Sequence, residues 1–377
     1  MDMKTKNYLL CGLLMMFISC KKDANMVSPV INTSPESNRT VLVYMGGNNN
    51  LSNETYDKIE ALKTSYTLGM GKLLIFQAAK GISPKLMEIR AGNNGHAEIK
   101  MLKTYNNRNA ASCGVFKDVL QDLVKEAPAD SYGLVLFSHA SGWLPERTLI
   151  MPRTILQDSN KDMELPDFAA AIPDHFFDFM VFESCFMAGI EVAYELKDKT
   201  DYIVASSAEI LSPGFIEIYP KALPCLYKPT ADLISFAQLY FNHYNQNEGD
   251  LRAATIAVIN TRTLPALGAW VRHHADDTFQ AHDLKEVQHF DRYQTHRLFF
   301  DFEDYYRRLS PPESHNELAI LLQNTIVYKA ATPRFLLGYS GFVIHEFSGL
   351  TSYIPQEDFG YLNTAYKKLK WTVAVTR

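Results

Sequence analysis

Cysteine is scarce in this chain, and none of its cysteines forms a C-x-x-C pair. The 377 residues contain five cysteines, of which Cys11 and Cys20 lie in an amino-terminal leader. Three cysteines remain, Cys113, Cys185 and Cys225. Their number is odd, and no two of them are close together in the sequence. This argues against both a disulfide framework and a zinc site, so we expect no bound metal. One of the three is then a candidate nucleophile.

A pronounced excess of charge is also missing. The chain has 37 basic and 42 acidic residues, with a formal net charge of −5 at pH 7, and it carries no basic stripe with interleaved aromatic residues. A nucleic-acid-binding protein needs such a surface, so nucleic acid is not an expected partner. The composition is that of an ordinary folded protein, and no internal repeat calls for a second domain.

The apolar run at residues 8–18 is too short to span a bilayer. Lys4 and Lys6 precede it, which is typical of a signal peptide. The run ends in FISC, and this ending resembles the lipobox of bacterial lipoproteins. We therefore expect residues 1–20 to be a lipoprotein signal peptide ending at lipidated Cys20, with the protein anchored to a membrane of the bacterial cell envelope and facing away from the cytoplasm. The alternative is a plain signal peptide with an incidental cysteine.

After the leader, residues 21–38 are polar and rich in Ser, Asn and Pro, which predicts a flexible tether. From residue 39 onward, apolar runs alternate with helical patterns. This alternation predicts a single domain over residues 39–377, an α/β fold in the form of a three-layer αβα sandwich with a mostly parallel sheet. The predicted strands are 39–45, 72–79, 131–139, 176–182, 201–207 and 252–260, and the predicted helices are 53–66, 115–126, 187–197 and 231–243.

Two chemically active side chains follow consecutive predicted strands. His139 ends LVLFSH and Cys185 ends FMVFESC, and the chemistry of such sheets lies just beyond the carboxyl ends of the strands. An imidazole can take the proton of a thiol and later pass it to a leaving amine. A helix beginning at Cys185 would lower the thiol pKa further. His139 precedes Cys185 by 46 residues, close to the spacing in caspases, and this order excludes the papain arrangement.

His139 and Cys185 belong to segments that, together with others along the chain, match the motifs of a known family. In chain order, the segments TVLVYMGGNNNLS, FSHASGW, ESCFMAGIEVAYEL, VASSAEILSPG and FSGLTSYIP resemble the clostripain-type cysteine peptidases, family C11 of the caspase-like clan. The resemblance implies a cysteine endopeptidase acting on peptide or protein substrates, with His139 as base and Cys185 as nucleophile. It also implies an oxyanion hole from the backbone N–H groups of Ala140 and Cys185.

The resemblance further implies a pocket for the substrate residue before the cleaved bond (P1), formed by Glu183 and Ser207. A carboxylate there favours cleavage after Arg or Lys. Legumain-like sequences carry Glu at this place and prefer Asn, so that preference is the alternative. The family is often matured by cleavage between its catalytic residues, and we expect self-cleavage at Arg147, Arg153 or Lys161.

Two departures from the family pattern motivate a rival hypothesis. Ala140 replaces the usual Gly after the catalytic His, and Asn48 to Asn50 replace a loop that carries Asp. Calcium dependence, known for some relatives, is therefore not expected, and no other cofactor is implied. The rival is a catalytically inactive surface lipoprotein that uses a caspase-like fold for binding.

Overall fold

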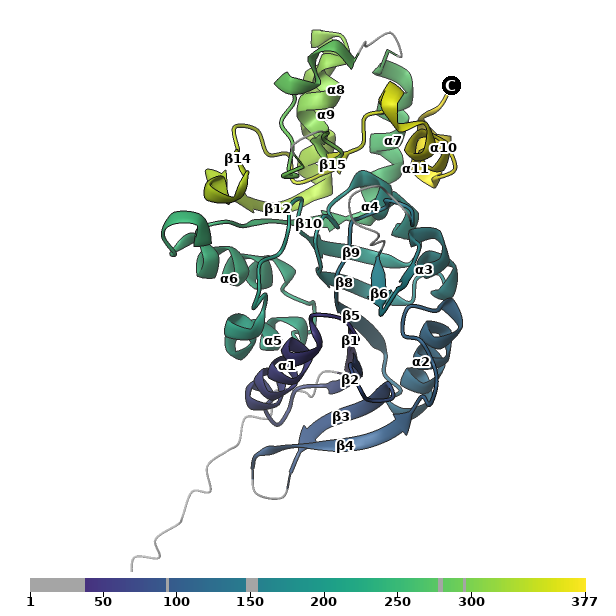
Figure 1. Cartoon of the computed structure of the whole chain (residues 1–377), viewed down its shortest axis with the longest axis vertical. Coiled ribbons are helices and arrows are strands. Elements are labelled where there is room, and N and C mark those ends of the chain that lie inside the picture. The colour runs from purple at the N-terminus through teal and green to yellow at the C-terminus, as the bar shows by residue number, and fades with distance from the viewer. Residues whose placement is uncertain (1–37, 93–94, 147–154, 277–280, 294–295) are drawn as a thin grey trace, which may run out of the picture. The chain divides into compact units, whose positions relative to one another are not determined.

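A nine-stranded sheet runs through the molecule in the order β12-β10-β9-β8-β5-β1-β2-β3-β4 (Figure 1). The structure is a computed structural model that describes residues 38–377 apart from 93–94, 147–154, 277–280 and 294–295, and these belong to one compact unit. The strands of the sheet are β1 (Arg39–Gly47), β2 (Lys72–Ala79), β3 (Lys85–Ala91), β4 (Ala97–Thr104), β5 (Ser131–Ser138), β8 (Phe177–Glu183), β9 (Thr200–Ala205), β10 (Thr255–Asn260) and β12 (Ile326–Ala331).

The centre of the sheet is parallel and its two margins are antiparallel. Strands β2, β1, β5, β8 and β9 pair in parallel, whereas β3, β4, β10 and β12 pair antiparallel. The short turns after β2 and β3 can only join antiparallel strands, because a parallel connection needs a long crossover. The predicted α/β sandwich is confirmed, with a sheet that is mixed rather than mostly parallel.

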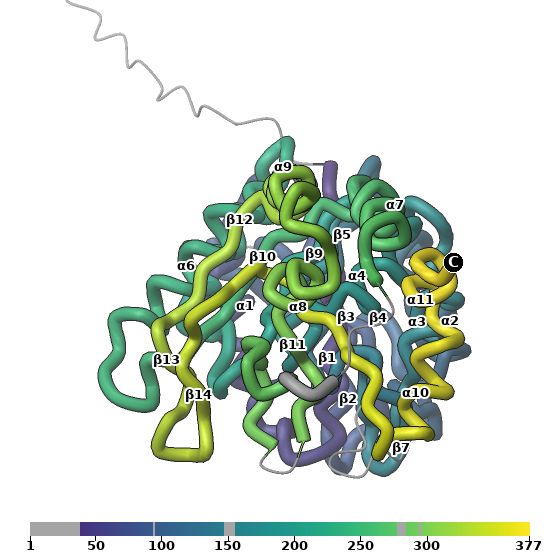
Figure 2. Tube along the Cα trace, turned by 90° about the horizontal axis from the view of Figure 1, so that it is seen from above, coloured from purple at the N-terminus to yellow at the C-terminus, as the bar shows by residue number. Residues whose placement is uncertain are grey.

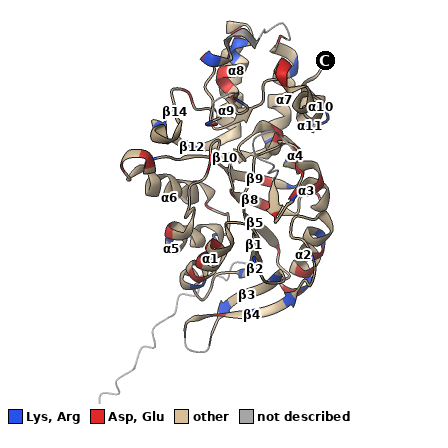
Figure 3. Ribbon diagram, in the orientation of Figure 1, with Lys and Arg blue, Asp and Glu red and all other residues tan. Residues whose placement is uncertain are grey.

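Helices cover both faces of the sheet, as its sequence pattern requires. On β1, Val41 and Val43 belong to the apolar cluster under α1, α5 and α6, and Leu42 and Tyr44 belong to the cluster under α2 and α3. Because side chains alternate along a strand, an apolar run without alternation fills both layers. Figure 3 shows acidic and basic residues interspersed over the outer helices.

The helices and short strands complete the fold. The helices are α1 (Ser52–Ser65), α2 (Cys113–Glu126), α3 (Leu165–Ala171), α4 (Ile190–Leu196), α5 (Tyr219–Leu226), α6 (Leu233–Asn245), α7 (Leu264–His274), α8 (Phe302–Arg308), α9 (His315–Thr325), α10 (Gly360–Tyr366) and α11 (Lys370–Val375); the short strands are β6 (Leu156–Asp158), β7 (Lys161–Met163), β11 (Phe300–Asp301), β13 (Arg334–Phe335), β14 (Phe342–Val343) and β15 (Thr351–Ser352). Within the described residues, no helix combines the length and apolarity needed to cross a membrane.

The carboxyl-terminal segment is fastened to the sheet domain by a buried carboxylate. Figure 2 shows this segment, in yellow, running beside α8 and ending at α10 and α11 next to α7. Glu191 of α4 is 1% exposed and accepts a hydrogen bond from the Tyr353 amide at 2.7 Å. Burial raises the pKa of Glu191 from 4.5 to about 7. The fold therefore holds this group protonated at a pH where the unfolded chain ionises it.

Replacing Glu191 with Gln should reduce the change in the free energy of unfolding between pH 5 and pH 8. A carboxyl whose pKa is raised on folding contributes stability that is present below pH 4.5 and is lost as the pH rises through about 7. For Glu191 this amounts to at most about 3 kcal/mol. Urea titrations at pH 5 and pH 8 should show a smaller fall in the free energy of unfolding for Glu191→Gln than for the wild type.

The exposed Glu60, whose side chain is 65% accessible, provides the control. Glu60→Gln should keep the wild-type pH dependence. Burial also raises the pKa of Asp291 and Asp301 to about 6, so Glu191→Gln should retain part of the fall. Parallel stability curves for Glu191→Gln and the wild type would show that Glu191 does not titrate in this range.

Candidate active site

The site lies at the carboxyl edge of two neighbouring strands. Strands β5 and β8 pair in parallel, with Phe137 opposite Glu183. His139 and Cys185 each follow this last matched pair by two residues. Their strands are therefore neighbours, as the sequence predicts, and both side chains emerge at the same end of the sheet.

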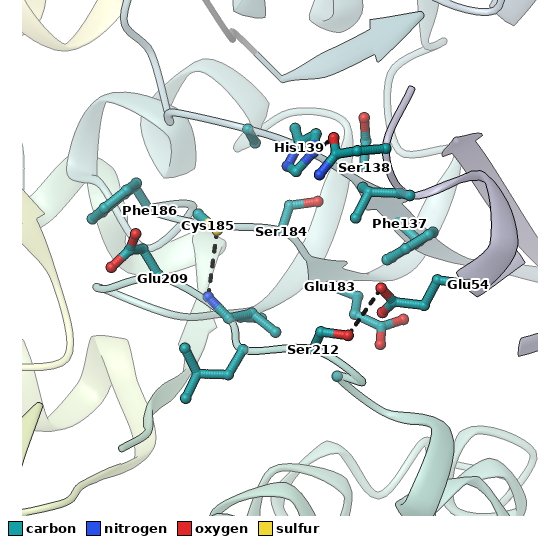
Figure 4. A pocket seen from close by; sticks show the side chains of 16 residues that line it. Glu54, Phe137, Ser138, His139, Glu183, Ser184, Cys185, Phe186, Glu209 and Ser212 are labelled. Atoms are coloured by element: carbon teal, nitrogen blue, oxygen red, sulfur yellow. Dashed lines mark hydrogen bonds between the residues drawn. The ribbon is translucent and has the colours of Figure 1, made fainter. Parts of the chain in front are cut away.

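Both residues line one cavity of about 300 Å³ and are half-buried (Figure 4). The wall combines the ends of β5 and β8 with the start of α1 and the loop after β9. The lining residues are Asn50, Leu51, Glu54, Phe137, Ser138, His139, Ala140, Glu183, Ser184, Cys185, Phe186, Glu209, Ile210, Leu211, Ser212 and Gly214.

Asn50 orients the imidazole of His139. Its Oδ1 lies 2.6 Å from His139 Nε2. An amide oxygen accepts, so this contact favours the tautomer with the proton on Nε2 and the lone pair on Nδ1. Asn50 is a site residue that was not predicted from the sequence. Its place just after β1, at the same edge of the sheet as His139, was the signal that could have identified it.

Cys185 lies in a turn, and the predicted helix beginning at this residue is wrong. Residues 184–188 form a bend and turns, and α4 begins only at Ile190. The turn is held by bonds to the loop after β9, from the Phe186 amide to Ala208 O at 3.0 Å and from the Ala188 amide to Ser206 O at 3.0 Å. These bonds replace a helical ladder. The Ile210 amide donates to Cys185 Sγ at 3.4 Å, which ties the sulfur to the loop after β9.

The loops that carry His139 and Cys185 pack directly on each other. Phe186 has φ of 60°, a strained value for an aromatic residue, and its ring stacks on Phe299 with centroids 4.4 Å apart. Gly142, with φ of 65°, lies so close that an added Cβ would be 2.7 Å from Phe186 O. The glycine therefore permits the close approach of the two loops.

Ala140 occupies the predicted oxyanion region without backbone strain. It is 5% exposed and lines the cavity with Cys185. The positive φ of this loop falls at Gly142 and not at Ala140. The methyl group at position 140 therefore does not oppose the backbone conformation there, although the family pattern has Gly at this place.

Glu183 lies in the cavity wall, but its carboxylate already has a cationic partner. Lys58 Nζ lies 2.6 Å from Glu183 Oε1, and the two side chains are 0% and 1% exposed. The Phe215 amide and the Tyr219 hydroxyl also donate to this carboxylate. Burial raises the pKa of Glu183, while the Lys58 ammonium opposes that shift.

One residue of the loop after β9, Ser207, is predicted to line the P1 pocket but does not line the cavity. Ser207 is fully buried and is not among the cavity-lining residues. The wall is formed by the next residues of the loop, because the chain turns toward the cavity only after Ala208. Glu209 lines the cavity and pairs with Arg292, whose Nη2 lies 2.8 Å from Glu209 Oε1. This pair ties the segment before β11 to the rim of the site.

The asparagine loop is hydrogen-bonded to a buried carboxylate. Asn48 Nδ2 donates to Asp158 Oδ1 at 2.7 Å, and the Ala110 amide donates to Asp158 Oδ2. Both oxygens of this carboxylate therefore accept hydrogen bonds from the protein. Among the described residues, no group of three or more His, Cys, Asp and Glu side chains could hold a metal ion.

The predicted processing sites fall mostly outside the described structure. Arg147 and Arg153 lie outside the described residues, as does Cys20. Lys161 is exposed and begins β7, opposite Asp158 in a two-stranded hairpin.

A histidine and a cysteine that share a cavity at the edge of a parallel sheet form the arrangement of a cysteine-dependent hydrolase. Comparison with known proteins agrees. The profile of the clostripain family, Peptidase_C11, matches residues 43–331, and the chain therefore belongs to the clostripain family. Clostripain of Hathewaya histolytica is 26% identical over 231 residues, which are 52% of this chain and 43% of clostripain. The match thus spans less than half the length of that relative.

Two solved structures are similar over nearly the whole chain. An inactive zymogen C11 protease from Parabacteroides distasonis is 32% identical with a TM-score of 0.81, covering 91% of this chain and 99% of its own. A secreted C11 cysteine protease from Bacteroides thetaiotaomicron, in complex with an irreversible peptide inhibitor, is 26% identical with a TM-score of 0.78, covering 89% and 98%.

Substituting Gly142 with Ala should destabilise the protein through the contact with Phe186. The variant places a Cβ 2.7 Å from Phe186 O and also imposes a side chain on φ of 65°. Gly81→Ala is the matched control, because Gly81 has φ of 76° with no atom within 4 Å. Both variants should lose about 1 kcal/mol through the backbone conformation. Gly142→Ala should lose at least ~1 kcal/mol more through overpacking, measured by urea denaturation. Equal losses would show that the two loops separate freely.

Proposed function

We propose that this protein is a cysteine endopeptidase that uses His139 and Cys185 as a catalytic dyad. The observation that carries the proposal is their emergence from paired parallel strands into one cavity. The membership of the clostripain family supports it. The Parabacteroides relative is described as an inactive zymogen, which supports self-processing at Arg147, Arg153 or Lys161 as part of the proposal.

The reaction proceeds through an acyl-enzyme. Nδ1 of His139 takes the thiol proton, while Asn50 holds Nε2. The thiolate of Cys185 attacks the peptide carbonyl, and the backbone N–H groups of Ala140 and Cys185 bind the oxyanion. The imidazolium then protonates the departing amine as the C–N bond breaks. Water, deprotonated by His139, attacks the thioester and releases the acid and the free thiol.

Cleavage after Arg or Lys is the leading substrate class, because the cavity beside Cys185 contains the carboxylates of Glu54 and Glu183. Cleavage after Asn is the second candidate, since Glu183 is already paired with Lys58 and does not present a free charge. A panel of fluorogenic peptides that differ only at P1 separates the two.

We further propose that the protein is lipid-anchored at Cys20 outside the cytoplasm. The lipobox-like FISC segment motivates this, and the Bacteroides relative is described as secreted. Incorporation of an alkyne-labelled palmitate into the wild type, but not into Cys20→Ala, is the expected result. Equal labelling of both proteins would contradict the anchor.

Cys185→Ala should abolish peptidase activity and self-processing together. The loss of the nucleophile should lower turnover of an Arg or Lys peptide by at least about a thousandfold. An acyloxymethyl ketone with Arg at P1 should modify the wild type at Cys185, seen by peptide mass mapping. The intact mass of the variant should remain that of the uncut chain.

Cys225→Ala, at a buried cysteine on α5, is the control and should keep activity and labelling. A cut that persists in Cys185→Ala would exclude self-cleavage. A wild type that neither turns over any P1 peptide nor reacts with the ketone would favour the inactive, binding lipoprotein.

Asn50→Ala should reduce kcat by about 10- to 100-fold with little change in KM, because the imidazole loses the acceptor that orients it. Asn50→Asp keeps an acceptor and adds a negative charge, which favours the imidazolium. It should restore most of kcat at pH 8 and move the acidic limb of the pH profile upward. The exposed Asn53→Ala on α1 is the control. An equal loss of kcat in Asn50→Asp and Asn50→Ala, with no shift of the limb, would contradict the positioning role.

A further inference from the structure

A buried lysine of the protein itself pairs with Glu183, a residue of the cavity wall. Lys58, on α1, is fully buried, and its Nζ contacts Glu183 Oε1 at 2.6 Å and Pro213 O at 3.0 Å. Glu54 Oε1 lies 3.4 Å from the same atom. The ammonium group thus donates hydrogen bonds to Glu183 and Pro213 and forms an ion pair with Glu54. The same Nζ also lies 4.3 Å from the centre of the Phe137 ring.

Glu183 has no room for a second cation. Its Oε1 receives Lys58 and the Phe215 amide, and its Oε2 receives the Tyr219 hydroxyl at 3.2 Å. A Cβ at Gly214 would overlap Glu183 Oε1, so the backbone passes directly over the carboxylate. The side chain is 1% exposed. A substrate cation that reached Glu183 would have to displace Lys58 from a buried ion pair, which is costly.

Glu54 is the carboxylate that remains available to a substrate. Its side chain is 15% exposed and lines the cavity with Ser212, whose hydroxyl donates to Glu54 Oε2 at 3.1 Å (Figure 4). Glu54 and Glu183 share a single ammonium, that of Lys58, so the cluster keeps one net negative charge. Of the two carboxylates, Glu54 is the one that is exposed to the cavity.

We propose that Glu54 selects the P1 side chain of the substrate, while the Lys58–Glu183 pair is fixed and takes no substrate cation. The inference rests on the proposed peptidase function and concerns which carboxylate of its pocket recognises the substrate. The substrate class is a peptide with Arg or Lys at P1, bound through a charge-assisted hydrogen bond to Glu54, because Lys58 already occupies the carboxylate of Glu183.

The test measures kcat/KM on four peptides that differ only in Arg, Lys, Gln or Asn at P1. Glu54→Gln should lower kcat/KM for Arg and Lys by about 10- to 100-fold, the usual effect of removing a charged partner, and change the Gln and Asn peptides less than about threefold. Glu54→Asp, with its charge kept, should retain an intermediate preference for Arg and Lys. Glu60→Gln, on the exposed side of the same helix, should match the wild type.

The double variant Lys58→Met with Glu183→Gln removes both charges of the Lys58–Glu183 pair without leaving either one unpaired. It should keep a clear preference for cationic P1 residues, because Glu54 is unchanged. Loss of that preference in the double variant, or equal losses on all four peptides in Glu54→Gln, would overturn the inference and leave the peptidase activity standing. Absence of cleavage of every peptide by the wild type, together with no ketone adduct at Cys185, would overturn the proposed function itself.

Discussion

The parallel pairing of β5 with β8 is the constraint on which the site depends. With Phe137 opposite Glu183, both strands end at the same level, and His139 and Cys185 follow at equal distance from that pair. Because the strands are buried on both faces by helices, a shift of register by one residue would exchange the side chains of the two closely packed layers and disrupt the packing of both. The core therefore protects the alignment of the two active residues.

Two further contacts convert that alignment into a shaped cavity. Gly142 allows the loop after β5 to rest on the turn after β8, and Phe186 is held in that turn by its stack on Phe299. On the other side, the ammonium of Lys58 joins α1 to the end of β8 through Glu183. Helix α1 thereby supplies one wall of the cavity, and its Glu54 carries the charge that faces solvent.

The local sequence patterns predicted the central strands correctly, because each of them is a short apolar run with clear turn signals at its ends. They failed where a tertiary contact outweighed local propensity. The segment after Cys185 has a helical pattern, yet the amides of Phe186 and Ala188 bond to the loop after β9, so α4 starts at Ile190. Likewise, spacing alone could not place Glu209 in the cavity wall and Ser207 outside it, because the chain bends at residues 207–208 and the spacing does not show in which direction it bends.

The layered α/β fold and the place of a histidine and a cysteine at two consecutive strand ends follow from the pattern of apolar runs alone. The groups that surround these two residues could not be predicted, because they come from distant parts of the chain. Asn50 and Glu54 are far from Cys185 in sequence and reach the cavity because β1 lies beside β5 in the sheet, and Lys58 of the same helix as Glu54 pairs with Glu183. A carboxylate such as Glu183 acquires its role from its partner, and a buried lysine that neutralises it is visible only after folding.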